Sequence, residues 1–250
     1  MEINQDWAYY YSLVQDKPAS IRLNLALAEV APIEDYALRT WFSVKLLNPD
    51  ENGLTTNEEF EKIGEIEDAV SDALANSGAI FVGTIKNNGM ADFYFYSKEI
   101  YNYKEIIHTV MSNYKEYRFA IDTQEDATWS AYFDFLYPSA YEMQTIRNRK
   151  VLMQLDQLGD DPEKERKVDH WIYFKSEKDR DNFIKEAEIL GYHILSLEKV
   201  EGEYPYQLNI DRLDNTIWDN VDNYVWELVT IANENNGYYD GWGSPIMKEE

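Results

Sequence analysis

The sequence contains no cysteine and only three histidines among its 250 residues. The absence of cysteine excludes disulfides, thiolate catalysis and cysteine-ligated zinc or iron–sulfur sites, and it is typical of a reducing compartment. The histidines, His108, His170 and His193, do not have the spacing of a zinc motif. The sequence also lacks a phosphate loop, a dinucleotide fingerprint and a nucleophile elbow. We therefore expect neither a metal nor a cofactor.

Basic residues and long apolar runs are also scarce. Lys and Arg number 23 against 47 Asp and Glu, which gives a net charge of −24 with acids dominating both halves. Such a field repels phosphate backbones, so direct nucleic-acid binding is not expected; a basic protein partner would suit it, and so would a simple role in solubility. Without a signal-like start or an apolar run near ~20 residues, we expect a cytoplasmic protein that does not engage membranes.

Hydrophobic residues make up 44% of the chain, enough for folded cores. In the first half, period-two alternation and turn residues predict strands at 19–27, 40–47, 79–85, 91–96 and 117–121. A Thr56–Glu59 capping box predicts a helix that ends near Gly78, and a second helix is expected at 100–114. The aromatic stretch 129–138 is expected to be partly helical.

A second capping box, Ser139 with Glu142, predicts a connector helix, and the run Gly-Asp-Asp-Pro at 159–162 ends it. The second half then repeats the order of elements, with strands at 168–174, 193–199, 204–212 and shortly after Trp242, and helices between them. We expect an α+β protein with two tandem ferredoxin-like (βαββαβ) antiparallel sheet domains. The expected boundaries are 1–138, 139–162 for the connector, and 163–250.

In a ferredoxin-like domain two helices cover one face of the sheet and leave the other open. In the second half, alternation assigns Leu195 and Leu197 to the covered face, and Asp169, Trp171 and Tyr173 to the open face. Aromatic side chains on an open face are either covered by another part of the chain or bind a partner. These three residues are our first candidates for a partner-binding surface.

The first half is expected to have a similar open face, which carries Tyr94 and Tyr96. RNA-recognition modules share this strand order and stack bases on sheet aromatics. The strand at 91–96 lacks the basic and glycine positions of that module's signature, and the net charge also opposes it. A protein surface is therefore the favoured interpretation.

Residues 237–243, Gly-Tyr-Tyr-Asp-Gly-Trp-Gly, gather three glycines, three aromatic residues and one acid after a long amphipathic run. Glycine permits a helix to stop and the chain to turn, and the rings offer flat contact surfaces. We expect a turn whose Tyr239, Asp240 and Trp242 contact a partner. A helix stop followed by a strand whose rings cap the core is the alternative.

The second half resembles the RraB family, the regulators of ribonuclease E activity B. The resemblance rests on residues 166–174, on Phe183, on Gly191 with Tyr192, and above all on the Tyr-Asp-Gly-Trp-Gly ending. The first half, with Trp7, residues 18–21 and the aromatic run 129–138, is similar to the bacterial family numbered six-nine-five among domains of unknown function. The resemblance implies a bacterial α+β protein without catalysis of its own that binds and restrains an RNA-degrading endoribonuclease of the ribonuclease E type, or its scaffold region.

Three functions follow as hypotheses. The first is a non-catalytic regulator that acts by protein–protein binding. The second is a carboxylate-dependent hydrolase of unknown substrate, for which Asp240, His170 and His193 are candidates. The third is a structural or scaffold protein that associates through sheet edges. The oligomeric state is not set by the sequence.

Overall fold

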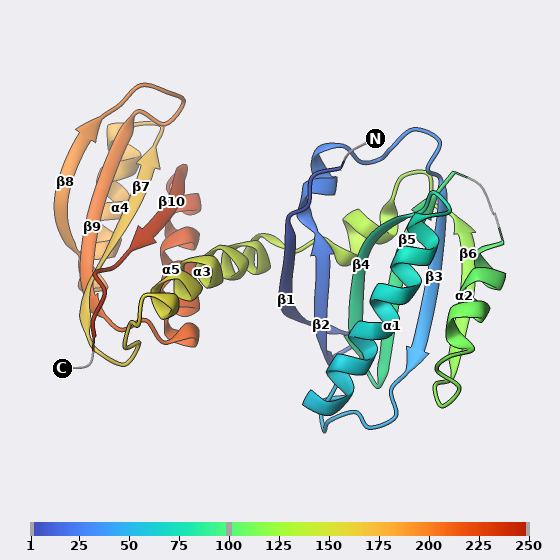
Figure 1. Cartoon of the computed structure of the whole chain (residues 1–250). Helices are drawn as coiled ribbons and strands as arrows, with labels where there is room; N and C mark the ends of the chain where they lie inside the picture. Colours follow the sequence, from blue (N-terminus) through green and yellow to red (C-terminus); the bar gives the residue numbers. More distant parts are fainter. Residues whose placement is uncertain (1–2, 99–101, 249–250) are drawn as a thin grey trace. The chain divides into compact units, whose positions relative to one another are not determined.

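A computed structural model describes residues 3–98 and 102–248 of the chain, and it shows an α+β protein with two antiparallel sheets (Figure 1). The chain divides into two compact units, residues 1–142 and 143–250. The expected class, two tandem α+β domains, is confirmed. Within residues 3–98 and 102–248, no helix has the length and apolar character needed to cross a membrane.

The first unit contains a six-stranded sheet with the order β1-β2-β4-β5-β3-β6. Its strands are β1 (Trp7–Val14), β2 (Lys17–Asn24), β3 (Leu38–Lys45), β4 (Ile80–Asn87), β5 (Met90–Ser97) and β6 (Phe119–Glu125). The last four strands have the ferredoxin-like order, and the β1–β2 hairpin extends the sheet beyond β4. Asn88 and Gly89 join β4 to β5 with φ of 50° and 76°, so the predicted two-residue hairpin turn is present.

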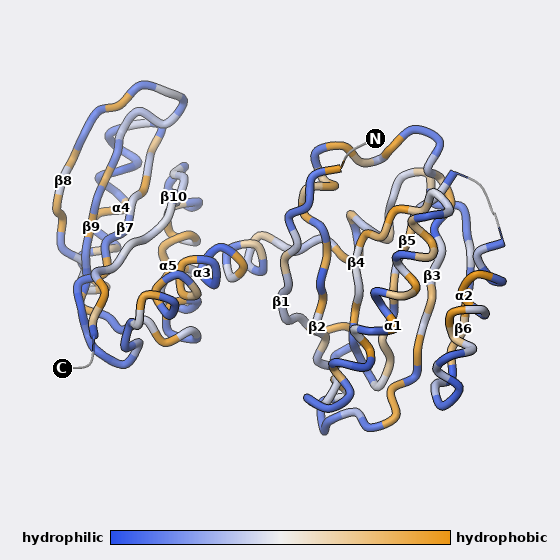
Figure 2. The backbone as a smooth tube through the Cα atoms, viewed as in Figure 1, coloured by the Kyte–Doolittle hydropathy of each residue, from blue (hydrophilic) through white to orange (hydrophobic). Residues whose placement is uncertain are grey.

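Two helices, α1 (Asn57–Ala75) and α2 (Tyr103–Met111), belong to the same unit, and the expected start of the second at residue 100 lies outside the described residues. Hydrophobic and hydrophilic residues alternate along α1 (Figure 2), and Ile63, Ile66 and Val70 enter a core with side chains of β3 and β5. The predicted capping box is wrong, because Thr56 makes no side-chain cap. Glu59 instead accepts hydrogen bonds from the backbone N–H groups of residues 47 and 48.

The other face of the first sheet is closed, which corrects the expectation of an open face there. Tyr94 and Tyr96 are buried, and the Tyr96 ring stacks on Trp129 at 4.0 Å between centroids. Trp129 precedes a short π-helix, η2 (Ala131–Leu136), and the hydroxyl of Tyr10 donates a hydrogen bond to the Leu136 carbonyl. The aromatic stretch predicted to be partly helical is therefore the cover of this face.

The structure differs from the sequence prediction in two further places, at the end of β2 and in β1. The predicted strand 19–27 ends at Asn24 and continues as a 3-10 helix, η1 (Leu25–Glu29), because the Asn24 side chain accepts a hydrogen bond from the Ala26 N–H and caps it. The aromatic start of the chain forms β1, which we did not predict. β1 and β2 form a hairpin in which Tyr9 lies opposite Arg22 and Tyr11 lies opposite Ser20.

The second unit contains a four-stranded sheet with the order β10-β7-β9-β8, the ferredoxin-like arrangement. Its strands are β7 (Arg166–Phe174), β8 (His193–Lys199), β9 (Tyr206–Asp214) and β10 (Gly237–Gly243), and its helices are α4 (Glu177–Ile189), α5 (Trp218–Glu234) and the greater part of α3 (Ala140–Gln157). The predicted Ser139–Glu142 capping box is formed, and the Ser176 hydroxyl caps α4 by accepting a hydrogen bond from the Asp179 N–H. The last strand is the glycine-rich segment itself, not a segment after Trp242.

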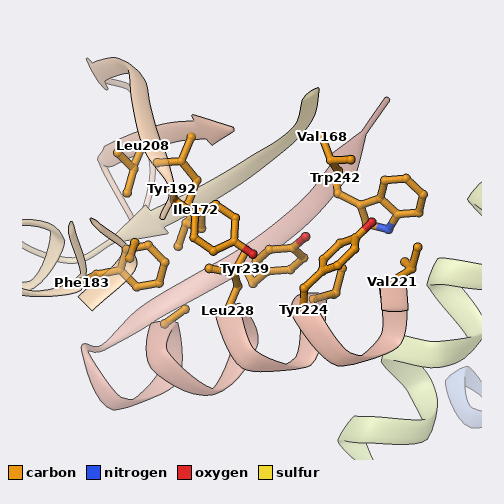
Figure 3. Close-up of a cluster of buried hydrophobic side chains, with 14 of the residues drawn as sticks. Val168, Ile172, Phe183, Tyr192, Leu208, Val221, Tyr224, Leu228, Tyr239 and Trp242 are labelled. Carbon is orange, nitrogen blue, oxygen red and sulfur yellow. The ribbon is translucent and has the colours of Figure 1, made fainter. Parts of the chain in front are cut away.

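One face of this sheet packs on α4 and α5. Its core includes Val168, Ile172 and Leu208 from the strands and Val221 and Leu228 from α5 (Figure 3). Leu195 and Leu197, which we expected under the helices, are about half exposed. They lie on β8, an edge strand, where a bulge between Ile194 and Ser196 interrupts the alternation of side chains.

Candidate functional site

The candidate site is the face of the second sheet that points away from α4 and α5. Along β7, His170 and Ile172 are fully buried, whereas Asp169, Trp171 and Tyr173 are partly exposed. Successive side chains of a strand point to opposite faces, so these three share the face without helices. The structure therefore places Asp169, Trp171 and Tyr173 together, as the sequence pattern predicts.

Aromatic side chains from three segments meet on this face. Tyr238 of β10 pairs directly with Tyr173 and is 46% exposed. The ring of Tyr204, from the loop before β9, lies 6.1 Å from that of Tyr238. The indole of Trp171 extends toward Gly243, where a Cβ atom would lie 3.4 Å from its ring. The result is an aromatic strip along β7 and β10, defined by Trp171, Tyr173, Tyr238 and Tyr204.

Polar groups hold this strip in position. Gln207 lies opposite Tyr173 on β9 and donates a hydrogen bond of 2.8 Å from Nε2 to the Tyr173 hydroxyl. Burial, followed by the charge of Asp240, raises the pKa of Tyr173 above its ordinary value, so the phenol stays protonated at neutral pH. The strip thus presents apolar rings with hydroxyl edges.

Acidic groups lie beside the strip. Asp169 and Asp211 are cross-strand partners on β7 and β9, and burial together with the charge of Asp211 raises the pKa of Asp169. The Asp211 side chain is 2% exposed, and its carboxylate lies 2.7 Å from Lys167 Nζ and 3.3 Å from His193 Nδ1. One ammonium group therefore faces two adjacent carboxylates, which leaves this part of the face acidic.

Tyr239 and Trp242, which we expected on the contact surface, are buried instead, with 5% and 8% exposure. Figure 3 shows both side chains directed toward α5. The Tyr239 hydroxyl lies 2.8 Å from His170 Nδ1, and Trp242 donates a hydrogen bond from Nε1 to Asn148 Oδ1. Both residues belong to the core, which agrees with the alternative of rings that cap it.

A β-bulge explains why both rings point inward. Residues 239 and 242 are three apart, so a regular strand would place them on opposite faces. The register shifts between Tyr239 and Gly241, with Asp240 as the extra residue. Asp240 is exposed at this bulge. Of the three expected contact residues in this segment, only Asp240 is therefore available to a partner.

The residues proposed for a hydrolase are not brought together. His170 has no exposed surface, and the rings of Tyr192, Tyr224 and Tyr239 lie within 6.0 Å of it. Burial, followed by the charge of Arg212, lowers the pKa of His170 to about 3. Asp240 is exposed whereas His170 is inaccessible, so the two cannot share a substrate. Across the part of the chain that the structure describes, no group of three or more His, Asp or Glu side chains is arranged to hold a metal ion.

Sequence reasoning missed Tyr238 and Tyr204 as members of the site. The signal for Tyr238 was its place beside Tyr239, because one of two adjacent strand residues must face outward. Which of the two faces outward depends on the pairing with β7, and this information is not local. Tyr204 lies in a loop and has no periodicity that could identify it.

The fold and this face define a pair of α+β domains, the second of which has a one-sided sheet with aromatic and acidic side chains on its open face. Residues 5–137 match the family model described as a family of unknown function, DUF695. This match covers more than half of the chain, which therefore belongs to that family. Residues 145–244 match the model of RraB, regulator of ribonuclease activity B. Both resemblances and their order along the chain are confirmed.

No curated protein matches the sequence. Among solved structures, the chain is similar to a protein provisionally named a glycine cleavage system transcriptional repressor, with 7% identity, coverage of 84% of this chain and 98% of the other, and a TM-score of 0.27. It is also similar to an unknown protein from Galdieria sulphuraria, with 9% identity, coverage of 84% and 99%, and a TM-score of 0.22. Similarity at this level supports no conclusion about the present chain.

Proposed function

We propose that this chain is a non-catalytic regulator whose second unit binds a protein partner through the open face of its sheet. The observation that carries the proposal is the aromatic strip, in which Trp171, Tyr173 and Tyr238 lie side by side on the face without helices. Contiguous exposed rings on a soluble domain are a common mark of a binding surface. Trp and Tyr also dominate the energetics of protein interfaces.

The partner is a basic protein surface. Asp169 and Asp240 lie on or beside the strip, and the chain as a whole carries a net charge of −24. Complementary charges raise the association rate and make it sensitive to salt, whereas the rings supply most of the affinity. We expect the association rate to fall as salt rises, with a smaller change in the dissociation rate.

The match of residues 145–244 to RraB supports a regulatory role and a ribonuclease as the class of partner. At finer detail, we propose an RNA-degrading endoribonuclease of the ribonuclease E type, whose cleavage of RNA the chain restrains by occupying a basic surface. This mechanism requires no catalytic group on the chain. It also agrees with the acidic composition, which disfavours direct binding to RNA.

Calorimetric titration of the full chain with such an endoribonuclease tests the proposal, together with the rate of RNA cleavage in the same mixture. Trp171→Ala and Tyr238→Ala should each weaken binding by about tenfold or more and relieve the inhibition of cleavage. Trp218→Ala is the matched control, because Trp218 is an exposed indole on α5, on the other side of the sheet. Unchanged affinity in both strip variants would show that this face is not the contact surface.

A further inference from the structure

The first unit contains a groove that the regulatory proposal does not use. It lies between the β1–β2 hairpin and α1, with a volume of about 510 Å³. Two cross-strand rows form its floor: Tyr9, Arg22 and Thr84 in one, and Tyr11, Ser20 and Lys86 in the other. Ligand pockets in proteins have volumes of about 300–1,000 Å³, so the groove has room for a small molecule.

The aromatic residues of the groove are two tyrosines of its floor and one phenylalanine of its wall. Tyr9, Tyr11 and Phe60 line it, and their side chains are 42%, 56% and 58% exposed. The two tyrosines come from β1, and the phenylalanine comes from the first turn of α1. Three large rings around a concave surface form a site in which a flat apolar body can be stacked and shielded from water.

Gly64 is one of the residues that line the groove. It lies inside α1, where glycine is less favourable than alanine by about 1 kcal/mol. A Cβ atom at this position would meet no heavy atom within 4 Å, so packing within the described chain does not require glycine here. A residue that lowers the stability of a helix and that packing does not require is typical of a functional position. The space beside Gly64 belongs to the groove.

The charged groups of the groove leave the Lys86 ammonium without a direct ion pair, although the Glu67 carboxylate acts on it at longer range. Glu67 forms an ion pair with Arg22 and accepts a hydrogen bond of 2.6 Å from the Thr84 hydroxyl, so its two oxygens are both engaged. The Lys86 ammonium lies 4.3 Å from the centroid of the Phe60 ring and, among the residues that the structure describes, forms no ion pair. Burial lowers the pKa of Lys86, which reflects how poorly water solvates its charge. An anion would supply the missing interaction.

We propose that this groove binds a small organic anion with a flat apolar body and a single carboxylate. The body packs among Tyr9, Tyr11 and Phe60 beside Gly64, and the carboxylate contacts the Lys86 ammonium. Asp68, which is exposed and lines the groove, disfavours ligands with several negative charges, as does the net charge of the chain. Aromatic monocarboxylates are thus the class of ligand that the groove fits.

The test compares 2-naphthoate with the uncharged 2-naphthamide, both titrated into the full chain by calorimetry. We expect naphthoate to bind about tenfold more tightly than naphthamide, the order expected for a contact with a charged group. Lys86→Met keeps the apolar stem over Phe60 but removes the charge, so it should abolish the preference. If naphthoate shows no binding at millimolar concentration, or if the preference survives Lys86→Met, the proposal is wrong.

A second variant tests the position of the ligand independently of charge. Gly64→Phe fills the groove and should abolish binding of both compounds. Ala75→Phe is the matched control, because Ala75 is exposed on the same helix and does not line the groove. Circular dichroism of both variants checks that α1 is intact. Equal binding of naphthoate by a folded Gly64→Phe variant and the wild type would place the ligand elsewhere.

Discussion

The indole of Trp171 lies against the backbone of Gly243, where an added Cβ would be 3.4 Å from ring atoms Cη2 and Cζ3. That distance is an ordinary van der Waals contact, so alanine fits at position 243 without moving the ring. A longer side chain does not fit, because the indole already occupies the space above the strand. The glycine thus leaves room for the Trp171 indole at one end of the proposed contact surface.

We predict that Gly243→Leu weakens binding of the protein partner by about tenfold, as Trp171→Ala does, because it displaces the indole from the sheet. Gly243→Ala should bind like the wild type. Calorimetric titration with the endoribonuclease measures both variants, and thermal unfolding verifies that each is folded. Wild-type affinity in a folded Gly243→Leu variant would mean that the position of the indole does not matter to the partner.

The next prediction concerns the first residue of β10. A Cβ atom on Gly237 would lie 2.5 Å from Cε1 of Phe174, a ring with no exposed surface in the core. Gly237→Ala should therefore lower the free energy of unfolding by about 1–3 kcal/mol, the cost of overpacking a core. Gly241→Ala is the control on the same strand, since a Cβ there meets no heavy atom within 4 Å. Urea denaturation of the two variants should separate them clearly.

A third prediction concerns the buried histidine. The pKa of His170 is about 3 in the folded protein, because burial and Arg212 oppose its charged form, whereas an exposed histidine has a pKa near 6.5. The unfolded chain therefore binds a proton below about pH 6.5 that the folded chain does not bind. As the pH falls from 6.5 toward 3, His170 lowers the free energy of unfolding, with a slope of at most about 1.4 kcal/mol per pH unit.

His170→Gln removes this titration while it keeps a polar group near the Tyr239 hydroxyl. Denaturant unfolding at pH 7, 6 and 5 should show a smaller loss of stability on acidification in the variant than in the wild type. The carboxylates titrate in both proteins, so the difference between the two curves isolates the histidine. Parallel curves would contradict the assignment of a suppressed pKa to this ring.

The fourth prediction concerns a buried ion pair. Arg166 Nη1 lies 2.5 Å from Asp160 Oδ1, and the two side chains are 1% and 3% exposed. Burial opposes the charge of Asp160, but hydrogen bonds from the Met247 N–H and from Arg166 outweigh it and lower the pKa of the carboxyl. Asp160→Asn should lower the free energy of unfolding by roughly 3–5 kcal/mol, because it leaves a buried guanidinium without a counterion.

The neighbouring acid provides the control for this variant. Asp161 has a more exposed side chain and lies 3.8 Å from the Lys164 ammonium, so Asp161→Asn should cost less than about 1 kcal/mol. Because the pKa of Asp160 is lowered by folding, its contribution is complete above about pH 4 and is lost as the pH falls through the folded value. Guanidinium denaturation at pH 7 and pH 3 measures both effects. Equal costs for the two substitutions would contradict the role of the buried pair.

Sequence reasoning located the open face of the second unit because its evidence is local. Alternation along β7 separates Trp171 and Tyr173 from the buried positions between them, and the burial of those positions follows the same pattern. The Asn88-Gly89 turn is equally local, since both residues readily adopt the positive φ that the turn needs. These features depend on a few adjacent residues and on no distant contact.

The errors arose where a distant contact decides the structure. Tyr94 and Tyr96 alternate like residues of an open face, but a segment some thirty residues further along the chain covers them, as the hydrogen bond from Tyr96 to Asp126 indicates. The groove beside Gly64 lies between the β1–β2 hairpin and α1, and that hairpin was not predicted. The periodicity of one segment does not show which other element of the fold covers that segment.

The bulge at Asp240 shifts the alternation of inward and outward side chains in the last strand by one residue. Upstream of it, odd-numbered positions such as Tyr239 turn toward the helices, and downstream even-numbered positions such as Trp242 do so. Deletion of this one residue would remove the bulge and leave a regular strand in which Tyr239 and Trp242, then two positions apart, both still face the helices. The bulge thus lets the strand carry an outward carboxylate between two inward rings without displacing either of them.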